Sequence, residues 1–279
     1  MIDFLLDPFN FRFMNNAFLV AIMISIPTSM LSCYLVLKGW SLMGDAISHA
    51  VLPGIVLAYI FKIPLIIGAF IAGLFCSLVS SFISENSRIK KDTVLGVVFS
   101  GMFGIGLVLI TKVPTNLHLD HILFGNILGI TNDNLLLSIL ISAFVSFLIF
   151  IKRRDLMLFS FDEIQSNVLG INNKYLNFLL ITLTSVTVVA TLSSVGIILS
   201  IGLLITPGAI VFLLTKKFDQ MLILSILITS TSAFFGVYLS FFMDSSPAPT
   251  IILILSCVFF GTLILKTAYK KEFRKKYFK

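Results

Sequence analysis

Charged residues are scarce in this chain of 279 residues: they make up 12% of it, whereas hydrophobic residues make up 58%. A soluble domain carries about 25% charged residues, so this chain has too few to cover its surface in water. Several apolar runs reach the roughly 20 residues that a helix needs to cross a bilayer. The unpaired backbone N–H and C=O groups of an open sheet edge find no hydrogen-bond partner in lipid. The apolar runs also lack the strict alternation of apolar and polar residues that is typical of strands. The sequence therefore predicts an all-α, polytopic transmembrane helical bundle.

The chain also lacks the motifs of several enzyme classes. HExxH is absent, which removes the main support for an intramembrane zinc protease. The glycines at 39 and 44 have the spacing of a phosphate-binding loop, but the Lys and Ser/Thr that should follow are missing, and no strand precedes them. No nucleotide site is predicted, so any ATP that drives this protein must bind another subunit.

Cysteine is rare and unpaired in the sequence. Cys33, Cys76 and Cys257 are scattered through apolar runs, and none makes a CxxC pair. We interpret them as small apolar packing residues, not as a thiolate metal site or a disulfide framework.

The N-terminus lacks a short basic region followed by a small-residue cleavage site, so it is not expected to be a signal peptide.

Nine apolar segments are predicted to span the membrane within a single domain, 1–279, and eight or ten spans are the alternatives. Their expected ranges are 17–37, 39–61, 63–83, 94–112, 134–151, 175–194, 196–214, 221–243 and 250–268.

Basic residues give the chain a net charge of +7, and they gather just outside the apolar runs. The clusters lie at 88–91, 152–154, 216–217 and in the tail at 266–279. The positive-inside rule places all of them in the cytoplasm and the N-terminus outside. A net positive charge alone would also fit nucleic-acid binding, but the location of these residues next to the apolar runs argues against it.

The most informative feature is an ionisable pair, Asp45 and His49, inside the apolar segment from about 40 to 61. Ionisable groups inside a bilayer are costly and usually serve a substrate or ion path. Positions i and i+4 share one helix face, so both side chains could bind one cation. Their oxygen and nitrogen atoms suit Mn²⁺, Fe²⁺ or Zn²⁺. The alternative is a polar pair that stabilises helix packing. Pro53 and Gly54 are expected to break or kink this helix.

A second polar cluster, His118, Asp120 and His121, falls at the predicted external end of the fourth span. It is either solvated surface, or an entry relay or docking surface for an external binding protein. Asp244 precedes Ser-Ser-Pro, a composition that favours a turn.

The segment 155–173 follows a basic cluster and is predicted to lie in the cytoplasm. A short amphipathic helix from about Asp162 to Leu169 fits its pattern, with Glu163 on the polar side and Gly170 ending the helix. Such a helix either lies on lipid or contacts a partner protein.

The stretch at 38–54, Lys-Gly-Trp-Ser-Leu-Met-Gly-Asp-Ala-Ile-Ser-His-Ala-Val-Leu-Pro-Gly, resembles the signature of metal-ion ABC transporter permeases. Further matches extend the resemblance from about 36 to 265, at 85–90, 92–103, 118–129, 158–163 and 202–209. The stretches 86–90 and 119–125 are most similar to the chelated iron–manganese branch. Many relatives have Pro-Ala-Ala where this chain has Pro207-Gly208-Ala209, a departure expected to change local helix flexibility.

The resemblance implies the membrane-spanning permease subunit of an ATP-driven importer of divalent transition metal, a multi-pass protein of the bacterial cytoplasmic (inner) membrane. Its cargo would be Mn²⁺ or Fe²⁺, with Zn²⁺ as the alternative, and no cofactor would be bound permanently. The implied partners are a cytoplasmic ATP-binding subunit, an extracytoplasmic metal-binding protein and a second permease subunit, identical or related. The resemblance favours Asp45 and His49 as the metal path, and Asp162, Glu163 and Gly170 as the coupling segment for the ATPase.

Two other function classes remain open from the residues. An intramembrane metalloenzyme could use Asp45 and His49 as ligands, although no motif supplies a third ligand and a general base. A secondary transporter could be driven by a proton or sodium gradient. Adjacent genes for an ATPase and a metal-binding protein would separate these classes from an ABC permease.

Overall fold

The computed structural model describes residues 6–112 and 127–277, and the side chains of these residues up to 268. Within this part of the chain, nine helices are long and apolar enough to cross a membrane, as predicted. They are α2 (Arg12–Lys38), α3 (Met43–Phe61), α4 (Leu65–Asn86), α5 (Lys91–Lys112), α7 (Asn132–Phe161), α9 (Asn173–Val195), α10 (Ile197–Leu214), α11 (Phe218–Phe242) and α12 (Pro247–Tyr277). A short 3₁₀ turn, η1 (Asp7–Asn10), and a short helix, α8 (Glu163–Val168), complete the described elements.

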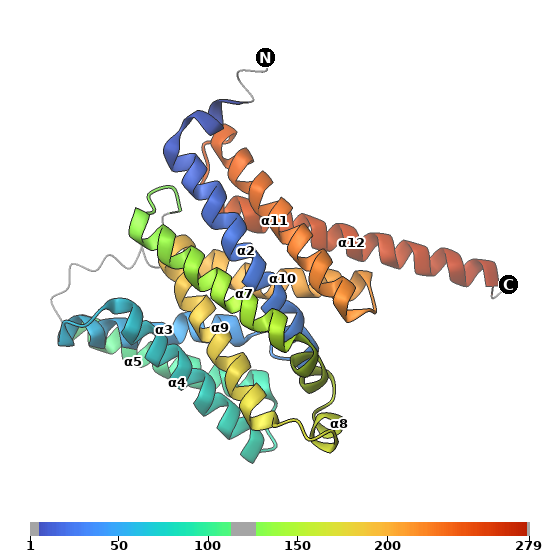
Figure 1. Cartoon of the computed structure of the whole chain (residues 1–279), viewed down its shortest axis with the longest axis horizontal. Helices are drawn as coiled ribbons and strands as arrows, with labels where there is room; N and C mark the ends of the chain where they lie inside the picture. Colours follow the sequence, from blue (N-terminus) through green and yellow to red (C-terminus); the bar gives the residue numbers. More distant parts are fainter. Residues whose placement is uncertain (1–5, 113–126, 278–279) are drawn as a thin grey trace.

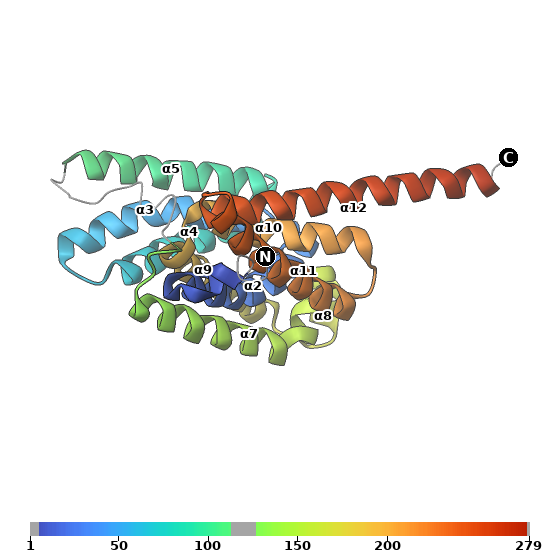
Figure 2. The same ribbon diagram turned by 90° about the horizontal axis from the view of Figure 1, so that it is seen from above.

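Helix α2 is the centre of the bundle, and it packs against α7, α10 and α11. Helices α3, α4 and α5 pack on one another on one side of it, whereas α11 and α12 lie on the other (Figure 1). The view from above shows the last part of α12 extending beyond the other helices (Figure 2). The apolar core accordingly has two parts. One surrounds the C-terminal half of α2 with α3, α7 and α9, and the other surrounds its N-terminal half with α10, α11 and α12.

Two glycines allow α3 and α4 to cross in backbone contact. A Cβ atom added to Gly54 would lie 2.2 Å from the carbonyl oxygen of Gly68, and one added to Gly68 would lie 2.3 Å from that of Gly54. Small residues are the usual means by which membrane helices approach this closely. The crossing therefore fixes the position of α3.

Of the break or kink expected at Pro53, the break is absent: α3 is one continuous helix from Met43 to Phe61. Proline removes only one backbone donor, and neighbouring helices in a membrane bundle compensate for such a loss. Pro53 is itself buried, so packing holds this turn in place.

Helices α2 and α10 approach each other at Pro207 and Gly208. The backbone N–H of Gly208 donates to Ser32 Oγ at 2.8 Å, and the Ser32 hydroxyl donates to the carbonyl of Ile205 at 3.2 Å. A Cβ atom at Gly208 would lie 2.5 Å from the carbonyl oxygen of Ser32. The glycine in Pro-Gly-Ala therefore allows a close helix contact here, in addition to any effect on flexibility.

Several helix boundaries differ from the predicted spans, and two of these differences have a clear physical reason. Helix α3 begins at Met43 and not at 39, because Gly39 adopts a left-handed conformation (φ 70°) and caps α2; the N–H of Trp40 donates to Leu35 O at 2.8 Å. Helix α7 continues ten residues beyond 151 to Phe161, through the basic cluster expected to end it. Lys and Arg are good helix formers, so a cluster of them marks the limit of the lipid without ending the helix.

Candidate functional site

Asp45 and His49 lie one turn apart on α3 and contact each other, as their spacing predicts. His49 Nε2 is 3.2 Å from Asp45 Oδ1, and the two side chains are 30% and 28% exposed, respectively. They therefore form a half-buried pair of one carboxylate and one imidazole, called here the Asp45–His49 pair.

The residues between the two explain why this stripe of α3 is the accessible one. Ala46 and Ile47 are fully buried in the core, and the Ser48 hydroxyl donates to Gly44 O of its own helix at 2.8 Å. On another side, Gly44 packs against α10, where an added Cβ atom would lie 2.8 Å from Leu204 Cδ1. Packing thus takes the other faces of the first turns of α3 and leaves the Asp45–His49 face half open.

Two aromatic rings from α5 flank the His49 imidazole. Phe99 is stacked on it with ring centroids 5.7 Å apart, and Phe103 meets it edge-on at 5.4 Å. These two phenylalanines restrict how the imidazole can turn, so they orient its nitrogen atoms. No local pattern in the sequence marks these two phenylalanines as part of the site.

Within residues 6–112 and 127–277, no group of three or more His, Cys, Asp or Glu side chains is close enough to hold one metal ion. This part of the chain therefore offers two protein ligands at the pair, a carboxylate oxygen and an imidazole nitrogen. A divalent transition metal accepts both atom types, and water can complete its coordination. Such a set holds an ion less tightly than a closed four-ligand site.

Of the other polar residues proposed from the sequence, His118, Asp120 and His121 lie outside the described residues. Asp244 has a positive φ of 48°, and the next residue, Ser245, donates its N–H to Ser240 O at 3.0 Å, so the predicted turn is confirmed. Cys33, Cys76 and Cys257 are all free thiols, as expected.

The predicted helix near 162–169 is present as α8. Asp162 caps it, since its Oδ1 accepts from the N–H groups of Ile164 at 2.9 Å and Gln165 at 3.0 Å. Gly170 follows with φ 78°, a conformation that favours glycine, and its N–H donates to Asn167 O at 3.0 Å. The predicted roles of Asp162 and Gly170 as the two ends of this helix are therefore confirmed.

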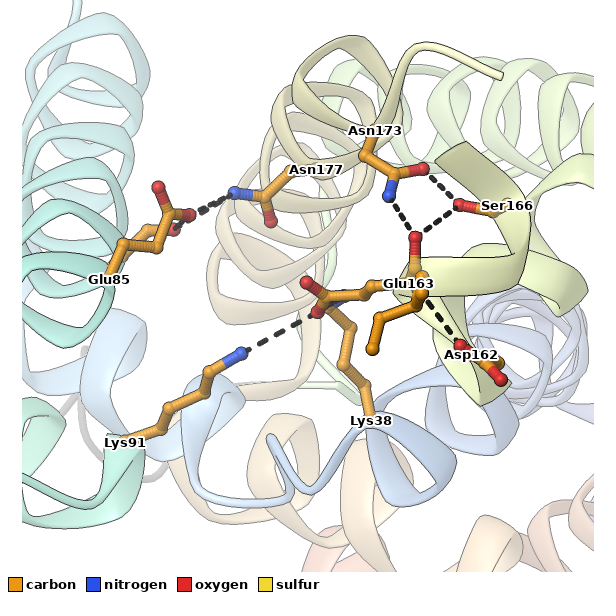
Figure 3. Close-up of polar contacts among 10 residues, drawn as sticks. Lys38, Glu85, Lys91, Asp162, Glu163, Ser166, Asn173 and Asn177 are labelled. Carbon is orange, nitrogen blue, oxygen red and sulfur yellow. Dashed lines mark hydrogen bonds and ion pairs between the residues drawn. The ribbon is translucent and has the colours of Figure 1, made fainter. Parts of the chain in front are cut away.

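The apolar residues of α8 are exposed, and its contacts with the protein are made by polar residues, Ser166 and Glu163. Ile164 is 78% exposed and Val168 81% exposed, whereas Ser166 is fully buried and hydrogen-bonds Asn173. Glu163 points toward Lys38 and Lys91 of the same chain, as Figure 3 shows. Glu163 thus makes an internal contact, whereas Ile164 and Val168 leave apolar side chains on the exposed surface of α8.

Lys38 and Lys91 keep Glu163 ionised. Partial burial alone would raise the pKa of this carboxyl group. The hydrogen bond and charge of Lys38, together with the charge of Lys91, outweigh burial and lower the pKa below its usual value.

Comparison with known proteins identifies the family. Residues 10–266 match the model described as the ABC 3 transport family. The chain is 48% identical over 258 residues to the chelated iron transport system membrane protein YfeD of Yersinia pestis, covering 92% of this chain and 87% of that one. It is 40% identical over 275 residues to the manganese transport system membrane protein MntB of a Synechocystis species, covering 98% and 90%.

The fold matches as well. The structure of PsaBC from Streptococcus pneumoniae in complex with Fab superposes with a TM-score of 0.83 at 33% identity, covering 94% of this chain and 95% of that one. These matches confirm the resemblance inferred from the motifs and, with the nine apolar helices, indicate a multi-pass protein of the bacterial inner membrane. The chain belongs to the ABC 3 transport family, as a membrane-spanning transport subunit and not an enzyme.

Proposed function

We propose that this chain is the permease subunit of an ATP-driven importer of divalent transition metal ions, with manganese and iron as the cargo. Family membership supports the transport class, and relatives named for iron and manganese transport support the cargo. The observation that carries the proposal is the Asp45–His49 pair, two metal-binding side chains in contact and half exposed within an apolar span.

The pair would act as a transient metal site on the path through the membrane. The Asp45 carboxylate offsets the charge of the cation, which lowers the cost of bringing it into an apolar region. The His49 imidazole supplies a nitrogen ligand that suits Mn²⁺ and Fe²⁺ better than the alkaline-earth ions. Because only two protein ligands are offered, the ion can leave when the conformation changes.

Helix α8 would be the element that couples this path to the ATPase. Its outward apolar residues can lie in a groove of a separate ATP-binding subunit on the cytoplasmic side. Asp162 and Gly170 hold the two ends of the helix, so they keep that face in a fixed position.

The remaining partners follow from the same class. An extracytoplasmic metal-binding protein would deliver the ion, with His118, Asp120 and His121 as the entry relay or docking surface. A second permease subunit, identical or related, would complete the path in the bilayer. The basic tail at 266–279 would lie in the cytoplasm, consistent with its charge. A metalloenzyme and a transporter driven by an ion gradient are disfavoured by membership of an ABC transport family.

Uptake of Mn²⁺ into proteoliposomes that contain the permease, its ATP-binding subunit and the metal-binding protein tests the proposal. Asp45→Asn and His49→Ala should each reduce ATP-dependent uptake to background while the complex still assembles. Asp133→Asn removes an exposed carboxylate from the first turn of α7 and should leave uptake unchanged. If both variants of the pair transport at the wild-type rate, the pair is a packing feature and the proposed path is wrong.

A further inference from the structure

Glu163 of α8 forms ion pairs with two different helices. Its Oε1 atom accepts from Lys38 Nζ at 2.7 Å, and Lys91 Nζ lies 3.9 Å from the same oxygen. Lys38 is the last residue of α2, and Lys91 is the first residue of α5. We call Lys38, Lys91 and Glu163 the Glu163 cluster (Figure 3).

The cluster is anchored in the protein through Lys38, although the Glu163 carboxylate itself is half exposed. The Lys38 side chain is only 3% exposed, and its ammonium group lies 3.2 Å from the centre of the Phe159 ring. The indole of Trp40 is near both cations, with Lys38 Nζ at 5.1 Å and Lys91 Nζ at 4.9 Å from its centre. Aromatic faces attract desolvated cations, so Trp40 and Phe159 hold the ammonium groups next to Glu163.

The same contacts bind α8 to the rest of the protein. The backbone carbonyl of Glu163 accepts from the side-chain amide of Asn173 at 2.7 Å, which joins α8 to the start of α9. On its other side, a cavity of about 450 Å³ lined by Trp40, Glu85, Lys91 and Glu163 leaves the carboxylate room to move. The ion pairs can therefore lengthen or exchange when α8 shifts.

Both lysines lead directly to the Asp45–His49 pair. Lys38 is followed by Gly39, buried Trp40 and the start of α3, and Asp45 lies in the first turn of that helix. Lys91 begins α5, whose Phe99 and Phe103 flank the His49 ring about two and three helical turns further along. Each lysine of the cluster is thus close along the chain to one part of the site. Lys38 precedes the helix that contains Asp45 and His49, and Lys91 begins the helix whose phenylalanines flank His49.

We propose that Glu163 is a positioning residue that transmits the movement of α8 to the metal path by pulling on the α2–α3 junction through Lys38 and on α5 through Lys91. This inference rests on the proposed function, and it assigns Glu163 an internal role instead of a contact with the ATPase. A displacement of α8 changes the spacing of α3 and α5, and with it the room between Asp45, His49 and the two phenylalanines.

The test measures Mn²⁺ transported per ATP hydrolysed in the reconstituted complex. Glu163→Gln should lower this ratio about fivefold or more, the usual lower range of coupling between sites, without loss of the ATPase on co-purification. Glu163→Lys should lower it further, and the double variant Glu163→Lys/Lys38→Glu should recover at least half of that loss. Asp133→Lys reverses the charge of an exposed carboxylate at the opposite end of α7 from α8, so it is the control and should have no effect.

A second measurement does not require the exchanged pair to fold. Trp40 is the single tryptophan of the chain and lies beside both lysines, so its fluorescence in the isolated permease reports on the surroundings of the cluster. Mn²⁺ should shift the Trp40 emission of the wild type, and the shift should be lost in both Glu163→Gln and His49→Ala. Thermodynamic reciprocity requires this response if the two sites are coupled.

Three outcomes would overturn the inference: a wild-type ratio in Glu163→Gln, a loss of ATPase binding that explains the whole defect, or a Trp40 emission indifferent to Mn²⁺. Failure of the proposed function is distinct, since it appears as normal uptake in Asp45→Asn and His49→Ala. If Asp45→Asn is inactive while Glu163→Gln couples normally, the metal path stands and the role of Glu163 falls.

Discussion

The Asp45–His49 pair and the Glu163 cluster are two charged sites of opposite construction. The pair comes from a single turn of α3, with both side chains about 30% exposed. The cluster is assembled from α2, α5 and α8, and its central ammonium group is almost fully buried. A site within one helix keeps its internal geometry when helices move, whereas a site shared by three helices changes at once.

In the proposed function, this difference separates binding of the ion from sensing of helix position. Asp45 and His49 keep their mutual spacing when the helices move, because both belong to one turn of α3. When the helices move, the position of the α5 phenylalanines relative to His49 changes. The Glu163 cluster joins the first residue of α5 to the last residue of α2 and to α8, so its distances depend on how these helices lie relative to one another.

The largest expected effect concerns the anchor of α3. Gly54→Ala should lower the stability of the permease by up to about 3 kcal/mol, because the added Cβ would meet the Gly68 carbonyl and backbone cannot move aside cheaply. Thermal unfolding in detergent measures this change. Gly104→Ala on α5 is the control, since nothing lies within 4 Å of its added Cβ, and it should be neutral or stabilising. Equal melting temperatures for the two variants would show that the crossing is not tight.

The next test asks whether the pair acts as one unit. Because both groups would bind the same ion, the losses of Mn²⁺ affinity caused by Asp45→Asn and by His49→Ala should not add up in the double variant. Equilibrium binding of Mn²⁺ to the purified permease provides the comparison. Additive losses in the double variant would indicate two independent steps and would remove the shared site.

A third test separates the outward face of α8 from its inward face. Ile164→Glu places a charge on the exposed apolar surface, and Gly170→Trp strains the left-handed residue that follows the helix. Each should lower co-purification of the ATP-binding subunit about tenfold, while Mn²⁺ binding at the pair is retained. Gln165→Glu changes a polar residue of the same helix and serves as the control. Full assembly of both variants would exclude α8 as the coupling element.

The smallest expected effect is the pH dependence of the Glu163 cluster. The pKa of Glu163 is lower in the folded protein than its usual value, so its contribution to stability is present above about pH 4.3 and is lost as the pH falls through the folded value. The carboxylate side chain is 53% exposed, which limits the contribution to less than about 1 kcal/mol. The difference in melting temperature between the wild type and Glu163→Gln should therefore shrink between pH 7 and pH 3.5. A difference that grows instead would contradict the sign.

Local features of the site could be predicted from the sequence. Hydropathy located the nine spans, because each is long enough to satisfy the bilayer by itself. The spacing of Asp45 and His49 predicted their contact, and Asp162 and Gly170 predicted the ends of α8, since all of these depend on one turn of backbone.

Features that depend on tertiary packing could not be predicted in this way. Lys38 and Glu163 are 125 positions apart, so no local pattern brings them together. Phe99 and Phe103 look like any lipid-facing residues until α5 is packed on α3. Helix α7 passed its predicted end because a basic cluster marks the membrane surface and not a backbone signal.

The hydrogen bond between Gly208 and Ser32 makes one backbone amide a reporter of the contact between α2 and α10. The N–H of Gly208 donates to a side chain of α2, a different helix from its own. Its exchange with solvent deuterium therefore requires α2 and α10 to separate locally, in addition to any fraying of α10 itself. The exchange rate of this amide, followed through the transport cycle, would record when these two helices part.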